Sequence, residues 1–169
     1  IEALESEGLV NKDQYIVCNG FKKPAYVENI ANFANNGWKN IIPVLDNMHE
    51  LEALDKLVEV PVNLGIRIAS EEDPKFDFYT SRLGIRYSDI VPFYENMISQ
   101  NRKFKLKMLH FFINTGVRDT AYYWNELAKC VGVYCDLKQI CPELDSLNIG
   151  GGFPIKNSLA TDFEYEYMA

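Results

Sequence analysis

The sequence predicts an α/β fold in which helices cover a parallel sheet, built from about five strand–helix units. Short apolar runs alternate about five times with longer segments whose apolar residues recur at helical spacing. Most of the short runs are continuously apolar, as expected for parallel strands buried on both faces. Such a repeat suits a TIM-type (β/α)8 barrel or an open doubly wound sheet. Because a complete barrel takes about 250 residues, a barrel of 169 residues would be partial.

The expected elements follow one another in a regular order. Pro24 stands in the first turn of the helix that follows the first strand, and Asn36-Gly37 can end that helix in a left-handed cap. Asp46 or Asn47 can cap the next helix. The expected strands are 15–18, 40–45, 62–68, 106–113 and 146–149, and the expected helices are 24–36, 47–57, 88–97 and 119–140.

The composition argues against several classes of partner. The formal net charge is −7 and the pI is about 4.9, whereas a nucleic-acid-binding protein would carry a basic stripe. The basic run 102–107 precedes an apolar strand and is interpreted as a solvated loop and the start of that strand. No apolar run approaches the roughly 20 residues that a membrane helix needs, and no signal peptide opens the chain. We therefore expect neither nucleic acid nor a membrane as a partner.

The cysteine spacing is neither that of a CxxC pair nor that of a zinc finger. The cysteines are Cys18, Cys130, Cys135 and Cys141. We expect reduced thiols in a cytoplasmic protein, and no metal site. The chain begins without Met and ends in mid-pattern, so both ends are expected to be cuts in a longer sequence.

The strongest local signal is Gly150-Gly151-Gly152, directly after the fifth expected strand. In parallel α/β folds, ligands bind at the carboxyl ends of strands. Three residues without a Cβ allow backbone N–H groups to approach a phosphate closely, although a tight turn would also use them. Asn114-Thr115-Gly116, after the preceding strand, adds a hydroxyl and small residues and so favours the phosphate interpretation.

Two further polar residues lie inside apolar strands. Arg67 needs a partner there, because an unpaired buried charge is costly, and the pattern leaves open a structural ion pair or a ligand contact. For His110, a hydrogen-bonded core histidine is the favoured interpretation. The sequence shows neither a Ser–His–Asp order nor a metal cluster, so it predicts a binding site more clearly than a catalytic one.

Five strings resemble those of the fold-type III pyridoxal-phosphate-dependent decarboxylases, in the same order and approximate spacing. They are IVCNGFK at 16–22, LGIR at 64–67, SRLGI at 81–85, LHFFINTG at 109–116 and LNIGGGFP at 147–154. They are similar to the family strings CNGYK, GxR, SKFGL, LHFHLGS and DxGGGF. Within the family, the chain most resembles the biosynthetic arginine decarboxylases. The resemblance implies an alanine racemase-like barrel, with residues 1–169 as an incomplete pyridoxal-phosphate-binding domain and the family's C-terminal β domain absent.

The resemblance also implies a function. The parent protein would be a cytoplasmic lyase of polyamine biosynthesis that converts L-arginine to agmatine and CO2, with pyridoxal 5'-phosphate as cofactor. Its partners would be a small amino-acid substrate and further copies of itself. The alternatives are a non-catalytic cofactor-binding homologue, an ornithine or diaminopimelate decarboxylase, or a different barrel that binds a sugar phosphate. The 169-residue chain alone is expected to be inactive.

Individual site residues follow from the same resemblance. The implied cofactor-binding residues are Gly150, Gly151, Gly152, Thr115, Arg67 and Phe112. The glycine amides would bind the phosphate, with Thr115 replacing a family serine. Arg67 would lie near the cofactor ring, and Phe112 occupies the position of a stacking histidine. Asn148 replaces the family's acidic residue before the glycines.

No residue is assigned to catalysis. The family's Schiff-base lysine lies on an earlier strand, in an Ala-Val-Lys-x-Asn context that this chain does not contain. Lys12, Lys22 and Lys23 are the lysines nearest to the first expected strand, and none of them matches that context. The Glu-Pro-Gly-Arg-like segment and the substrate-binding residues of the family would lie beyond Ala169.

Overall fold

The strands form one curled parallel sheet whose order follows the sequence. The computed structural model describes residues 1–70, 83–113 and 120–153. In these ranges the strands are β1 (Ile16–Cys18), β2 (Ile41–Leu45), β3 (Val62–Ile68), β4 (Phe104–Phe111) and β5 (Ser146–Asn148), paired in the order β1-β2-β3-β4-β5. A doubly wound sheet reverses its strand order near the middle. The unbroken order is therefore that of a barrel segment, which confirms the partial-barrel prediction and decides between the two folds.

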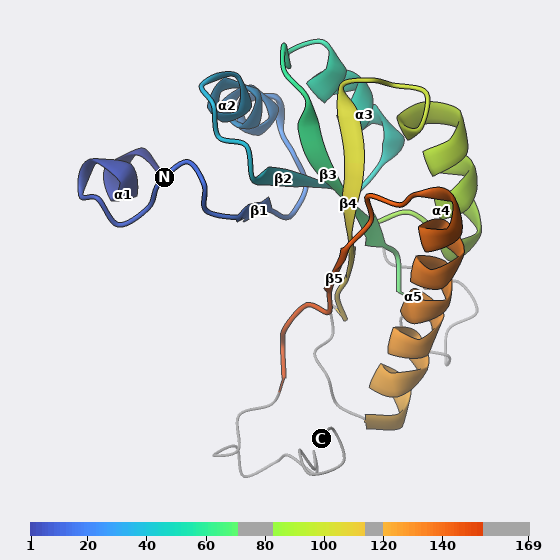
Figure 1. Cartoon of the computed structure of the whole chain (residues 1–169). Coiled ribbons are helices and arrows are strands. Elements are labelled where there is room, and N and C mark those ends of the chain that lie inside the picture. The colour runs from blue at the N-terminus through green and yellow to red at the C-terminus, as the bar shows by residue number, and fades with distance from the viewer. Residues whose placement is uncertain (71–82, 114–119, 154–169) are drawn as a thin grey trace, which may run out of the picture.

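The helices of the described ranges, except the first, follow the outer side of this curved sheet, and the first lies apart from it (Figure 1). They are α1 (Glu2–Ser6), α2 (Pro24–Asn35), α3 (Met48–Asp55), α4 (Tyr87–Phe93) with the π-helical turn η1 (Tyr94–Ile98), and α5 (Thr120–Ile140). Asn47 is the cap of α3, because its side chain accepts the N–H of Glu50 at 3.1 Å. No helix in the described ranges is long and apolar enough to cross a membrane.

Two details differ from the sequence prediction. The expected helix 88–97 is α-helical only to Phe93 and continues as the π-helical turn. Pro92 lies inside α4 and removes a backbone donor there, which favours such a local irregularity. The short α1, without buried residues, was not predicted, because five residues give too little periodicity to detect.

The two faces of the sheet bury different residues. The helix-side face supplies the large core, to which Leu45, Ile66 and Leu109 contribute with no exposed surface. The opposite face, which lines the inside of the curve, carries a smaller apolar cluster of Ile42, Val44 and Met108. We call this cluster the apolar layer. Successive residues of a strand point to opposite faces, so the sheet register determines which side chains lie above this layer.

Candidate functional site

Four polar residues lie one step beyond the apolar layer, toward the carboxyl ends of the strands. Arg67 on β3 pairs in register with His110 on β4, and His110 pairs with Asn148 on β5. Asp46 directly follows β2, whose Leu45 pairs with Ile66 of β3, so Asp46 lies beside Arg67. We call Asp46, Arg67, His110 and Asn148 the polar layer. Inward-facing residues of barrels stack in such layers.

Arg67 forms the structural ion pair that was one of the two roles left open by its sequence position. It is 6% exposed, and its guanidinium nitrogen lies 3.7 Å from Asp46 Oδ1. The guanidinium carbon also lies 5.8 Å from the centre of the Phe112 ring, within cation–π range. The arginine is thus held by a structural ion pair and stands beside the aromatic ring at the end of β4.

Asp46 is a buried carboxyl with little direct hydrogen bonding. Among the described residues, neither of its carboxylate oxygens has a hydrogen-bond partner. Burial raises the pKa of Asp46 and outweighs the positive charges of Lys22 and Arg67, which lower it, while the carboxylate of Glu50 raises it further. The polar layer thus places the guanidinium group of Arg67 beside a buried carboxyl whose pKa is raised by burial.

His110 is a buried histidine with a defined proton position. Its Nδ1 lies 3.2 Å from the carbonyl oxygen of Asn148, which can only accept, so Nδ1 carries the proton. Burial lowers the pKa of His110, the hydrogen bonds to Asn148 oppose this, and the charge of Arg67 lowers the pKa further. The favoured interpretation of His110 as a hydrogen-bonded core histidine is confirmed.

Residues 150–152, which we call the glycine loop, combine two glycines that their backbone conformation favours with one that leaves open space. A Cβ on Gly150 would lie 2.7 Å from the carbonyl oxygen of Phe111, and φ is +73° at this residue. Gly152 also has a positive φ, of +81°. A Cβ on Gly151 would meet no atom within 4 Å. Contacts within the described chain thus leave open space at Gly151, as a loop that binds a phosphate through its amides requires.

One amide of the glycine loop is already engaged. The N–H of Gly150 donates to Oδ1 of Asn148 at 3.0 Å. A phosphate at this loop would therefore be bound through the amides of Gly151 and Gly152. The open space at Gly151 and the positive charge of Arg67 fit such a phosphate.

A buried ion pair lies beside the polar layer. The ammonium group of Lys22 donates to the carbonyls of Gly20, at 3.0 Å, and Val44. It also donates to Oε2 of Glu50 at 3.1 Å, and the two side chains are 0% and 4% exposed. Glu50 in turn accepts the backbone N–H groups of Lys22 and Asp46, each at 3.0 Å. All three ammonium protons are thus used to join the ends of β1 and β2 to α3.

The structure brings some of the predicted site residues together. Arg67, Phe112 and Gly150 are neighbours: a Cβ on Gly150 would lie 3.1 Å from Cδ2 of Phe112. Gly151 and Gly152 continue from there, whereas Thr115 lies outside the described residues. The sequence analysis missed the contributions of Lys22, Glu50 and Asp46. Their signal was weak, since it consisted of charged residues just after two strands and in the first turn of a helix.

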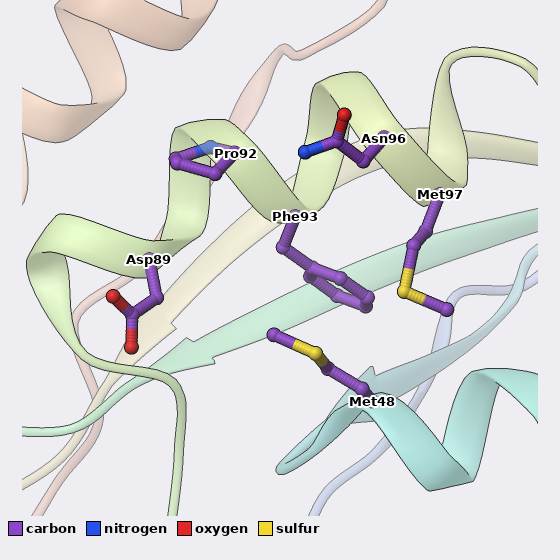
Figure 2. Close-up of a pocket in the computed structure, with 6 residues that line it drawn as sticks. All are labelled: Met48, Asp89, Pro92, Phe93, Asn96 and Met97. Carbon is purple, nitrogen blue, oxygen red and sulfur yellow. The ribbon is translucent and has the colours of Figure 1, made fainter.

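A separate cavity of about 260 Å³ lies in the helical layer, between α3 and α4. Figure 2 shows Phe93 and Met97 pointing toward Met48. Asp89, Pro92 and Asn96 complete its lining. None of these residues belongs to the polar layer or to the glycine loop, so the cavity is not part of the predicted site.

Comparison with known proteins defines the class. Residues 6–167 match the family model described as "Pyridoxal-dependent decarboxylase, pyridoxal binding domain". The chain therefore belongs to this family of pyridoxal-dependent decarboxylases, and its cofactor is pyridoxal phosphate.

Among its relatives, the biosynthetic arginine decarboxylase of Bacteroides thetaiotaomicron is 30% identical over 153 residues, which are 86% of this chain and 24% of that protein. Biosynthetic arginine decarboxylase 2 of Synechocystis is 27% identical over 83% of this chain and 23% of its own length. The chain thus spans about a quarter of these relatives.

Solved structures show the same fold. Lysine decarboxylase from Selenomonas ruminantium superposes with a TM-score of 0.75 at 18% identity, over 99% of this chain and 42% of that one. The biosynthetic arginine decarboxylase of Campylobacter jejuni gives 0.72 at 20% identity, over 96% of this chain and 28% of that one. At these identities the likeness supports the barrel fold alone.

Proposed function

We propose that the protein is a pyridoxal-phosphate-dependent arginine decarboxylase that releases CO2 from L-arginine and forms agmatine. The chain described above would be part of its cofactor-binding barrel. The observation that carries this proposal is the open glycine loop above a buried polar layer, in a chain whose curated relatives include biosynthetic arginine decarboxylases. When bound, the cofactor supplies an electron sink for the electron pair that CO2 leaves behind.

The residues of the chain would divide the work of binding. The amides of Gly151 and Gly152 would hold the phosphate, and Thr115 would add its hydroxyl. Arg67 would supply a fixed positive charge that favours an anionic ligand at this end of the barrel. Phe112 would cover one face of the cofactor ring, with its own ring held beside Arg67. The apolar layer of Ile42, Val44 and Met108 would exclude water from below.

The test is made on the full-length protein. Purified protein is titrated with pyridoxal 5'-phosphate while the visible absorbance of bound cofactor is recorded. Agmatine, putrescine, cadaverine and lysine are then measured after incubation with L-arginine, L-ornithine, L-lysine or meso-diaminopimelate. We expect bound cofactor and agmatine. Absence of both would overturn the proposal. A product other than agmatine would show that the protein is a decarboxylase with a different substrate.

A second candidate is a homologue that binds the cofactor without decarboxylation. It is favoured by Phe112, which stands where the family has a stacking histidine and can neither hydrogen-bond nor titrate. The same experiment separates the two, because this candidate predicts the absorbance of bound cofactor without any product.

Location and assembly belong to the same proposal. We expect a cytoplasmic homo-oligomer, as the family resemblance implies. Light scattering of the full-length protein checks the assembly, and a monomeric mass would contradict that part. Cell fractionation checks the location.

A further inference from the structure

Asn148 belongs to the polar layer and links it to the glycine loop by a hydrogen bond. We propose that His110 and Asn148 act as positioning residues that fix the loop so that the amides of Gly151 and Gly152, rather than that of Gly150, face the cofactor phosphate. This inference rests on the proposed cofactor site. We call the two hydrogen bonds from His110 to Asn148 and from Gly150 to Asn148 the clamp.

The first bond of the clamp joins two strands. The Nδ1–H group of His110 donates to the carbonyl oxygen of Asn148 at 3.2 Å, and the two residues are register partners on β4 and β5. His110 is 5% exposed, so water competes little for this bond. The end of β5 is thereby held to β4 by a side chain, at the point where the regular ladder stops.

The second bond joins the strand to the loop. Oδ1 of Asn148 accepts the N–H of Gly150 at 3.0 Å, an Asx-type contact two residues along the chain. One residue therefore contacts β4 through its main chain and the loop through its side chain. Any displacement of Asn148 would move the start of the loop.

The packing of Gly150 makes this position restrictive. There is no room for a Cβ between Gly150 and Phe111, and φ is positive. With Gly150 pressed against β4 and its donor engaged, the next amide belongs to Gly151, where a Cβ would meet nothing within 4 Å. The clamp thus selects which amides remain for an anion.

The charge state of the clamp also suits an anionic ligand. Asn148 contributes an uncharged acceptor at a position where the family has an acidic residue. His110 donates from a neutral ring because burial disfavours its charged form. The fixed positive charge at this level is then that of Arg67, offset by Asp46.

The experiment compares two ligands that differ only in the phosphate. The dissociation constants of pyridoxal 5'-phosphate and of pyridoxal are measured by absorbance titration on the full-length protein. The proteins are the wild type, Asn148→Ala, His110→Leu and His110→Asn, with Asn63→Ala as control. Asn63 lies at the opposite end of β3, where its side chain donates to the carbonyl of Lys39. Circular dichroism verifies folding.

The expected result is specific to the phosphate. Asn148→Ala and His110→Leu should weaken the binding of pyridoxal 5'-phosphate about tenfold, which corresponds to ~1.4 kcal/mol. They should change the dissociation constant of pyridoxal by less than about twofold. His110→Asn should restore most of the loss, since its amide nitrogen can occupy the position of Nδ1. Asn63→Ala should leave both constants unchanged.

The outcomes separate the clamp from the proposed function. If the wild type binds pyridoxal 5'-phosphate no more tightly than pyridoxal, the proposed phosphate site fails. If the wild type prefers pyridoxal 5'-phosphate over pyridoxal and the clamp variants show the same preference, the clamp is refuted. It is also refuted if the variants lose affinity for both ligands by the same factor.

Hydrogen exchange on the wild type gives a second measurement that does not depend on variant folding. The clamp predicts a protected Gly150 amide before cofactor is added, and amides of Gly151 and Gly152 that become protected only with cofactor. A Gly150 amide that exchanges as fast as that of Gly151 would refute the clamp.

Discussion

Replacing Lys22 with methionine is the sharpest test of the buried ion pair. The variant retains most of the side-chain volume but removes the charge and three donated hydrogen bonds, to Gly20, Val44 and Glu50. The carboxylate of Glu50, 4% exposed, would then lie buried without its counter-charge. Breaking such a pair costs ~3–5 kcal/mol, because the remaining ion is desolvated and uncompensated.

The structure places the expected loss near the lower end of that range. Glu50 would still accept the backbone N–H groups of Lys22 and Asp46, which compensate part of its charge. We therefore expect Lys22→Met to lower the free energy of unfolding by about 3 kcal/mol. Adding Glu50→Gln removes the isolated charge and should recover at least ~1 kcal/mol, the size of one hydrogen-bond contribution.

Urea unfolding of the full-length protein measures these losses, with Lys103→Met as the matched control. Lys103 pairs with Asp55 at 3.4 Å, and both side chains are 44% exposed, so solvent screens the pair. Its removal should cost less than ~1 kcal/mol. If Lys22→Met is no more destabilising than Lys103→Met, the structural account of this lysine is wrong.

Cofactor binding supplies an independent check on the same variant. All three protons of the Lys22 ammonium group are used within the chain, so this lysine is not expected to be the amine that attaches the cofactor. Folded Lys22→Met protein should therefore retain the visible absorbance of bound cofactor. Loss of that absorbance in a folded variant would show that Lys22 has a direct role.

The remaining predictions concern the stability of four single-residue variants. Gly84→Ala should destabilise the protein by more than ~1 kcal/mol, because φ is +101° and the new Cβ would lie 2.7 Å from the backbone nitrogen of Ala69. Gly132→Ala should instead stabilise α5 by up to ~1 kcal/mol, because a Cβ at this position meets nothing within 4 Å. Tyr123→Phe should be neutral or stabilising in thermal unfolding, because the buried hydroxyl has no hydrogen-bond partner among the described residues. Burial lowers the pKa of His110 from 6.5, so its contribution to stability is present above pH 6.5 and is lost as the pH falls through the folded-state value. The free energy of unfolding is measured in urea between pH 7.5 and 5, in steps of about half a pH unit around the ordinary histidine pKa. It should fall less steeply with decreasing pH for His110→Asn than for the wild type.

Much of the fold was predictable because its signals are local. Apolar runs gave the strands, and Pro24, Asn47 and Gly37 mark helix ends as their backbone chemistry requires. The choice between a barrel and a doubly wound sheet was not predictable from these patterns. Strand order depends on long-range packing, and identical strand–helix units serve both folds. The structure supplied that order.

The candidate site was likewise predictable from the sequence only in part. The glycine loop is a contiguous string and could be found in the sequence, as could the isolated Arg67. The pairing of Lys22 with Glu50 joins residues 28 positions apart, and the clamp joins His110 to a residue 38 positions away. Neither separation has a periodicity that a sequence pattern could reveal. Only the register of the sheet brings these side chains together.

The register also sets the order in which a ligand would meet the side chains at this end of the barrel. Inward-facing positions of one strand are two residues apart, roughly 6.6 Å along it. On β4 these positions are Met108, in the apolar layer, and His110, in the polar layer, and Phe112 directly follows the strand. A ligand that enters from the carboxyl ends of the strands therefore meets an aromatic ring and the glycine loop first. It next meets the polar layer. The apolar layer lies below and keeps the ligand out of the barrel interior.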